Sequence, residues 1–200
     1  MHSPAAQLEL AQLLSESRSR LRQAVSLRLD PRIAGRVDPS DVVQEAALEA
    51  TARYAEYLAN PTLPPHLWLR LLTIQRLALV HRQHLGVKAR DARREVYLES
   101  QTSPHHSELN LRTMADLILA RSNSPSRAAS KNELRTQVQE ALSQLEPLDR
   151  EVLALRHFEQ LSHADAARVM AISEAAASKR YLRALRKMRT ALQSLGLEEQ

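Results

Sequence analysis

The sequence has no cysteine and only three glycines, one tryptophan, one phenylalanine and four tyrosines among its 200 residues. Without cysteine the chain can form neither a disulfide framework nor a thiolate metal site, which fits a reducing cytoplasm. The scarcity of glycine, beside abundant alanine, leucine, arginine, glutamate and glutamine, favours helices nearly throughout. The sequence therefore predicts an all-α protein located in the cytoplasm.

Long apolar runs are missing too. No stretch reaches the roughly 18 apolar residues that a membrane-spanning helix needs, and the amino terminus lacks the basic-then-apolar pattern of a signal peptide. The chain is instead basic, with a formal net charge of +5 and a pI of about 10.0. We therefore expect no membrane association and a polyanionic partner.

Motifs that carry catalysis are also missing. The sequence contains no glycine-rich phosphate loop, no HExxH motif and no cysteine nucleophile. His81 and His84 lie three residues apart and His105 and His106 are adjacent, but neither pair has carboxylates nearby at ligand spacing. We predict that the protein is not an enzyme, binds no metal and carries no cofactor.

The most informative segment covers residues 147–195 and predicts a helix-turn-helix. Ser162 stands at the N-cap position of a short helix over His163–Met170, and Ser173 caps a longer helix after a tight joint at residues 171–172. Two capped helices this close together are typical of motifs that place their second helix in the major groove of DNA.

The second helix of this motif begins with small residues and is basic beyond them. Alanines at positions 175–177 would let the backbone approach base edges, while cations farther along would contact phosphates. Between Arg168 and Arg189 there are seven lysines and arginines and one acid, Glu174. The alternative interpretation is a solvated basic face on a helical hairpin.

An acidic helix is predicted in the amino-terminal half, with Asp38 as its N-cap and Pro39 in its first turn. The carboxylates of Asp41, Glu45 and Glu49 recur every four residues and so share one face. Asp38 and Asp41 could also be interpreted as the metal ligands of a nuclease, but the Asp-Pro-Ser-Asp sequence fits a helix start better.

A further helix begins near Pro65 and is apolar nearly all round, which favours the centre of a bundle with Trp68 in its core. Basic residues follow it. Between Arg70 and Arg94 there are seven lysines and arginines and one acid, Asp91. The chain thus has a basic element in each half.

Composition divides the chain into three parts. Residues 99–131 contain seven serines and two prolines, and they read as a flexible linker with one short amphipathic helix that could dock on a partner. The sequence therefore predicts two small helical domains, over residues 1–98 and 132–200, joined by this linker. The second domain carries the helix-turn-helix.

Three segments resemble those of bacterial sigma factors. Residues 38–45, DPSDVVQE, resemble the acidic segment that holds core RNA polymerase. Residues 68–70, with the basic stretch 82–94, are similar to the segments that melt and read the −10 promoter element. Residues 147–153, PLDREVL, with the helix-turn-helix behind them, resemble the domain that reads the −35 element. The order is similar to that of extracytoplasmic-function (ECF) sigma factors of the sigma-70 family.

The resemblance implies a transcription initiation factor that binds core RNA polymerase and promoter DNA, that is a monomer when free, and that has an anti-sigma factor as a further expected partner. The implied polymerase-binding residues are Asp38, Asp41, Gln44, Glu45 and Glu49. The implied −10 contacts are Gln75, Arg82, His84, Lys88, Arg90, Arg93 and Arg94. The implied −35 contacts are Glu174, Ser178, Lys179 and Arg183 in the groove, with Arg180 and Arg186 on phosphates.

Promoter melting would have an unusual basis in this chain. No aromatic residue lies between Trp68 and Tyr97, so stacking platforms worth about 1–3 kcal/mol per base are missing. Opening would then rely on capture of a flipped base and on cations along the backbone. The resemblance puts the capturing pocket near residues 84–88. We predict that transcription demands a close match to one −10 sequence.

Two other classes of protein are alternatives. A stand-alone helix-turn-helix regulator would bind duplex DNA without polymerase, but it would leave the acidic helix and the first basic element without roles. An adaptor that binds only proteins would use the basic helices as solvated faces, and it would show no salt-sensitive DNA association.

Overall fold

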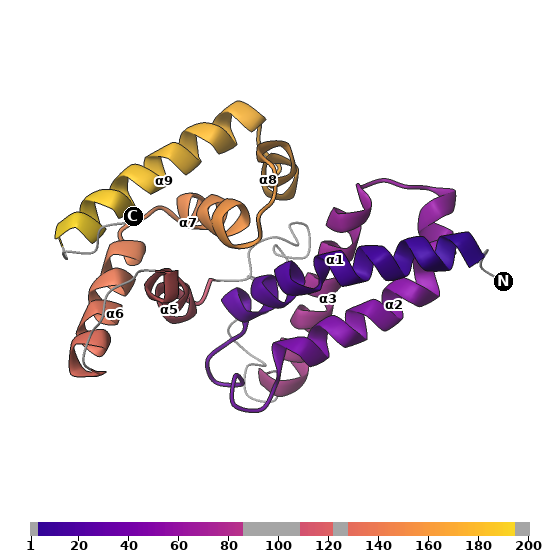
Figure 1. The fold of residues 1–200 in the computed structure, drawn as a ribbon, viewed down its shortest axis with the longest axis horizontal. Coiled ribbons are helices and arrows are strands. Elements are labelled where there is room, and N and C mark those ends of the chain that lie inside the picture. The colour runs from indigo at the N-terminus through magenta and orange to yellow at the C-terminus, as the bar shows by residue number, and fades with distance from the viewer. Residues whose placement is uncertain (1–3, 86–108, 122–127, 195–200) are drawn as a thin grey trace, which may run out of the picture. The chain divides into compact units, whose positions relative to one another are not determined.

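The computed structural model describes residues 4–85, 109–121 and 128–194 (Figure 1). Every regular element within these ranges is a helix, as the composition predicted. The chain divides into two compact units, Met1–Glu108 and Leu109–Gln200. Each unit is described by itself.

The first unit contains three long helices, α1 (Pro4–Arg28), α2 (Pro39–Ala59) and α3 (Pro65–Leu85), and each contacts the other two. The signals that start α2 are those expected. The Asp38 carboxylate accepts a hydrogen bond from the Ser40 amide at 2.7 Å, and Pro39 occupies the first turn. At the other end Asn60 caps the helix and Pro61 follows.

The core of the first unit includes a cluster of three aromatic rings. Trp68 on α3 stacks on Tyr57 with ring centroids 4.4 Å apart, and its centroid lies 6.0 Å from that of Tyr54. The hydroxyl of Tyr57 donates to the carbonyl of Leu63 at 2.8 Å, so the polar end of this ring is satisfied. Trp68 is therefore a core residue, as predicted.

The second unit consists of α5 (Leu111–Arg121), α6 (Ala128–Ser143), α7 (Pro147–Leu153), the π-helical turn η1 (Ala154–Phe158), α8 (His163–Met170) and α9 (Glu174–Ser194). Its core is lined by residues with no exposed surface, among them Val138, Val152, Leu155 and Phe158. The helix that Pro147 begins does not stay α-helical through Phe158. The structure instead widens the last turn, and the Glu159 amide donates to the Ala154 carbonyl at 3.0 Å.

Helix α5 corrects the predicted linker over residues 99–131. Met114 and Ala115 are fully buried, α5 packs against α6, and the Arg135 guanidinium lies 2.5 Å from the Asp116 carboxylate. Residues 109–121 therefore belong to the second unit, because the apolar face of this short helix is covered by its own domain. The parts of the predicted linker at residues 99–108 and 122–127 lie outside the described residues.

Candidate nucleic-acid interface

The helix-turn-helix forms at the predicted positions. The Ser162 hydroxyl accepts from the Asp165 amide at 3.0 Å and donates to the Asp165 carboxylate at 2.7 Å, which satisfies the first turn of α8. Ala171 ends α8 in the left-handed region, with φ 52° and ψ 39°. The Ser173 hydroxyl then accepts from the Ala176 amide at 3.2 Å and starts α9.

Small residues bring α8 and α9 close together. Ala166 and Ala177 have no exposed surface, and the two helices are in contact. The predicted role of the alanines 175–177 is therefore corrected for one of them, because Ala177 packs inside the motif. Ala175 is exposed and is free to approach a ligand, while Ala176 is partly buried.

Cations cover the exposed side of α9. Lys179, Arg186 and Arg189 are exposed, and so is Lys187 on the flank of the helix. The spacing of Lys179, Arg183 and Arg186, which is four and then three residues, places these three side chains on one face. This exposed basic stripe is the natural contact surface for a phosphate backbone.

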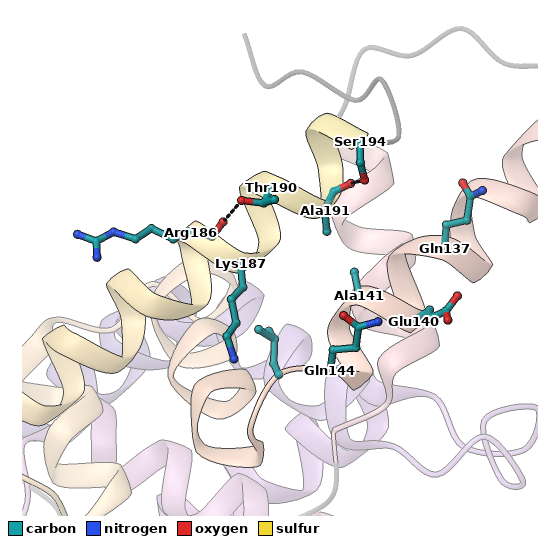
Figure 2. Close-up of a pocket in the computed structure, with 10 residues that line it drawn as sticks. Gln137, Glu140, Ala141, Gln144, Arg186, Lys187, Thr190, Ala191 and Ser194 are labelled. Carbon is teal, nitrogen blue, oxygen red and sulfur yellow. Dashed lines mark hydrogen bonds between the residues drawn. The ribbon is translucent and has the colours of Figure 1, made fainter.

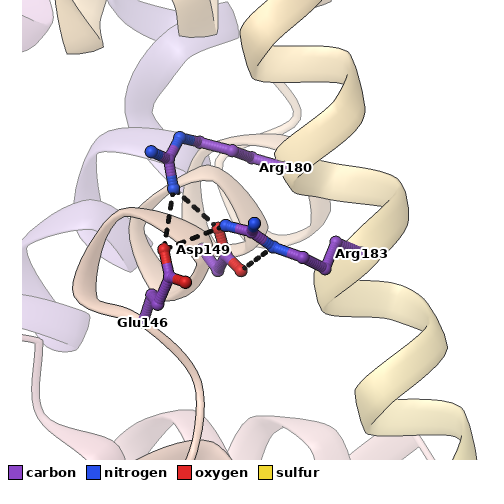
Figure 3. A network of polar contacts seen from close by, with 4 residues as sticks. All are labelled: Glu146, Asp149, Arg180 and Arg183. Atoms are coloured by element: carbon purple, nitrogen blue, oxygen red, sulfur yellow. Dashed lines mark hydrogen bonds and ion pairs between the residues drawn. The ribbon is translucent and has the colours of Figure 1, made fainter.

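Two of the predicted DNA-contacting arginines are joined to acids of the same unit (Figure 3). Arg183 on α9 holds the Asp149 carboxylate in a fork, with Nε to Oδ2 and NH2 to Oδ1 both at 2.7 Å. Arg180 donates to Asp149 at 3.0 Å. Both arginines also contact Glu146 Oε2, at 3.2 Å from Arg180 and 2.9 Å from Arg183. This acidic pair thus ties the recognition helix to the start of α7.

The environment of Asp149 favours its charged form. The side chain is fully buried. Burial raises the pKa of Asp149, but the hydrogen bonds from Arg183 and Arg180 outweigh burial and leave the pKa below its usual value of 3.8. The same contact with Asp149 raises the pKa of the Arg183 guanidinium. The contact between Asp149 and Arg183 therefore favours the charged form of both groups.

The remaining predicted −35 residues differ in their surroundings. Glu174 and Lys179 are exposed. Ser178 is half-buried, and its hydroxyl lies 3.4 Å from Nδ1 of His163, whose ring meets that of Tyr181 edge-on. The contacts of all these residues with DNA stay predictions.

An open groove of about 650 Å³ lies between α6 and α9. It is lined by Gln137, Glu140 and Ala141 of α6, by Gln144 and Leu145 just after that helix, and by the last turns of α9. Figure 2 shows Arg186 extending away from α6, whereas Lys187 takes a different direction from α9. Arg186, which was predicted to contact phosphates, is therefore directed outward from this groove.

The predicted polymerase-binding residues lie along α2 and at its N-cap. Asp38, Asp41 and Gln44 are exposed. Glu45 lies 3.3 Å from Arg76 of α3, and Glu49 lies 3.1 Å from Arg53 one turn further on. Two of the expected carboxylates are thus already paired within the first unit, although both remain accessible enough to exchange partners.

Sequence reasoning left one residue of this surface out of the predicted site. Leu48 is 72% exposed, and it stands one turn beyond Gln44 and Glu45. A large apolar side chain within a polar stripe could have marked it, because the buried core of an interface is more apolar than its rim. Leu48 thus lies on the same exposed face of α2 as Asp41, Gln44 and Glu45, a face that we call the acidic stripe.

The predicted −10 residues fall in two groups. Gln75, Arg82 and His84 lie on α3 and are exposed. Lys88, Arg90, Arg93 and Arg94 lie outside the described residues.

The structure also bears on the metal alternative. His81 does not pair with His84, since its Nε2 accepts a hydrogen bond from the Asp30 amide at 3.3 Å, and burial lowers the pKa of its ring. Within the described ranges there is no group of three or more potential metal ligands. None of the described helices is long and apolar enough to cross a membrane.

Comparison with known proteins agrees with this geometry. Residues 135–188 match the family model of sigma-70, region 4, and this segment includes the helix-turn-helix. The chain has the fold of CnrH, solved in complex with the cytosolic domain of CnrY, with a TM-score of 0.52 and 21% identity over 94% of this chain and 90% of that one. No curated protein sequence matches the chain. Residues 135–188 of the carboxy-terminal unit are thus similar to sigma-70 region 4, and the chain as a whole shares the fold of CnrH.

Proposed function

We propose that the protein is an ECF-type sigma factor, which binds core RNA polymerase and directs it to specific promoters. The observation that carries the proposal is the match of residues 135–188 to sigma-70 region 4, on a helix-turn-helix whose second helix exposes a row of cations. A likeness of fold to CnrH over 94% of the chain supports the same role for both units together.

In this proposal α9 enters the major groove at the −35 element. Its first turns carry Glu174, Ser178 and Lys179, which would meet base edges, and Arg186 lies farther along the helix for phosphates. The capped start of α8 and the left-handed joint at Ala171 define the turn between α8 and α9, which supports the proposal. The residues of α3 and of the segment after it would serve the −10 element.

The acidic stripe of α2 would bind the polymerase. Charges at the rim of such an interface mainly set the rate and orientation of docking, while apolar contacts supply the holding energy. Asp41 and Gln44 provide the polar part, and Leu48 provides an apolar side chain beside them. Together they form one continuous stripe on the exposed side of the helix.

Partners and location follow from the same role. CnrH was solved with the cytosolic domain of CnrY, so we propose a comparable protein partner, an anti-sigma factor, for this chain. The protein would act in the cytoplasm, as a monomer when it is free.

A gel shift separates this proposal from a stand-alone helix-turn-helix regulator. The free chain should bind a specific promoter poorly, and adding core polymerase should produce a strong, sequence-specific complex. Tight, specific binding by the free chain that core polymerase does not change would favour the stand-alone regulator. Absence of salt-sensitive DNA association in both conditions would favour the protein-only adaptor.

A further inference from the structure

We infer that Glu146 competes with DNA phosphate for Arg180 and Arg183, so that this carboxylate weakens the grip of α9 on DNA. The inference rests on the proposed function, because it concerns how the −35 reading helix uses its cations. It makes Glu146 an intramolecular brake in a domain that is otherwise basic.

The geometry puts the contested cation on the exposed basic stripe. Arg183 lies on the same face of α9 as Lys179 and Arg186, and its side chain is 44% exposed. Yet its guanidinium turns back to α7 and contacts two carboxylates (Figure 3). A cation placed for DNA is therefore occupied by an acid of its own domain.

The two acids hold the arginines in different ways. Asp149 is fully buried and accepts both bonds of the Arg183 fork, so water and salt screen this contact little. Glu146 is 56% exposed and offers a single oxygen, Oε2, to both arginines. An exposed ion pair of this kind contributes little and is easily exchanged. The Glu146 contact is thus the one that a phosphate can replace.

Charge balance explains why the exchange matters. Two arginines facing two carboxylates form a neutral group, which adds nothing to the attraction between α9 and a polyanion. A phosphate oxygen offers a guanidinium the same charge-assisted hydrogen bond as Glu146 does. Asp149 would keep both side chains in place while the exposed N–H groups move from Glu146 to DNA.

The fold does not need the Glu146 carboxylate at the start of α7. Glu146 stands at the N-cap, but its side chain makes no capping hydrogen bond. Removing its charge therefore leaves the helix start intact, so Glu146→Gln tests the competition without unfolding the domain. Glu133→Gln is the matched control, because Glu133 is an exposed acid of α6 whose loss changes the net charge equally.

The experiment measures binding of the full chain to a labelled duplex of mixed sequence by fluorescence anisotropy, between about 50 and 200 mM salt. At the lowest salt Glu146→Gln should bind about three- to tenfold more tightly than wild type, and its log–log salt slope should steepen by about one phosphate contact. Glu133→Gln should bind as wild type does. In an Arg183→Ala background the gain from Glu146→Gln should shrink.

Equal affinities and slopes for Glu146→Gln and Glu133→Gln would overturn the inference, as would a chain that binds no duplex at the lowest salt. If the Arg183→Ala chain fails to fold, the comparison of the two glutamine variants still decides the question. The proposed function is tested separately by transcription with core polymerase. Transcription that persists beside unchanged duplex binding would refute the brake alone.

Discussion

Asp149 and Arg183 form a two-bond ion pair that fastens the recognition helix α9 to the first turn of α7, with both N···O distances at 2.7 Å. The carboxylate is fully buried, while the guanidinium stays 44% exposed. One end of this pair is therefore fixed by the core and the other faces the surface that would meet DNA. The pair makes the orientation of α9 depend on a residue that itself has no access to DNA.

Removing the charge of Asp149 should destabilise the carboxy-terminal unit. Asp149→Asn leaves two arginines without their buried partner, which we expect to cost about 2–4 kcal/mol, less than for a fully buried pair because Arg183 is half-exposed. The single tryptophan, Trp68, lies in the other unit. In Asp149→Asn the loss of helix measured by circular dichroism should therefore begin under milder unfolding conditions. The unfolding transition reported by Trp68 fluorescence should stay unchanged. A shift of both transitions together, or of neither, would contradict this assignment.

The same carboxylate should make the unit sensitive to acid. The pKa of Asp149 in the folded protein lies below the usual 3.8, so its stabilisation is fully present above pH 3.8 and is lost as the pH falls through the folded value. The unfolding free energies of wild type and Asp149→Asn should therefore converge below about pH 4. Denaturant titrations across this range check the trend, and a constant difference down to low pH would argue against it.

Ala171 offers a gain in stability. It adopts φ 52° and ψ 39°, a conformation that alanine reaches at some cost and glycine readily. Ala171→Gly should stabilise the carboxy-terminal unit by about 0.5–1 kcal/mol. Ala175→Gly, at an exposed helical position of α9, is the matched control and should give no gain. Thermal melts compare the two variants with wild type. A lower stability of Ala171→Gly would mean that the left-handed backbone at position 171 is not strained in the wild type.

Leu48 should matter for polymerase binding. Leu48 and Leu8 are both 72% exposed, but only Leu48 lies within the acidic stripe. Leu48→Ser should weaken binding to core polymerase by more than about 1 kcal/mol, roughly fivefold or more. Leu8→Ser should leave the affinity unchanged. Equal effects of the two substitutions, measured by surface plasmon resonance against core enzyme, would exclude Leu48 as the apolar centre of the interface.

Promoter opening should depend closely on sequence. Trp68 is stacked within the core, so it cannot serve as a platform for a melted base. Transcription from a panel of single-base −10 variants should therefore fall sharply at most positions, because stacking worth about 1–3 kcal/mol per base is missing. Uniform tolerance across the panel would refute this prediction.

The sequence predicted local structure well where a short motif determines the backbone conformation. The N-caps at Asp38 and Ser162, the joint at residues 171–172 and the core position of Trp68 were all predicted and are confirmed. These features depend on residues that are neighbours in the chain or on one helical period. They therefore leave a pattern that can be read without the fold.

The features that sequence reasoning missed depend on contacts between distant segments. Residues 109–121 look like a linker by composition, and only the burial of Met114 and the contact of α5 with α6 show that they belong to the second unit. Likewise the charge pattern of α9 predicts six free cations, whereas Asp149 and Glu146 of α7 engage two of them across more than thirty positions. Neither partner is visible from the local sequence.

The most direct test of the central claim is run-off transcription with purified core RNA polymerase on a library of genomic promoters. We expect discrete transcripts to start from a small set of promoters only when both the chain and core enzyme are present, and we expect the two proteins to co-elute. A chain that never co-elutes with core polymerase and adds no transcript would contradict that claim.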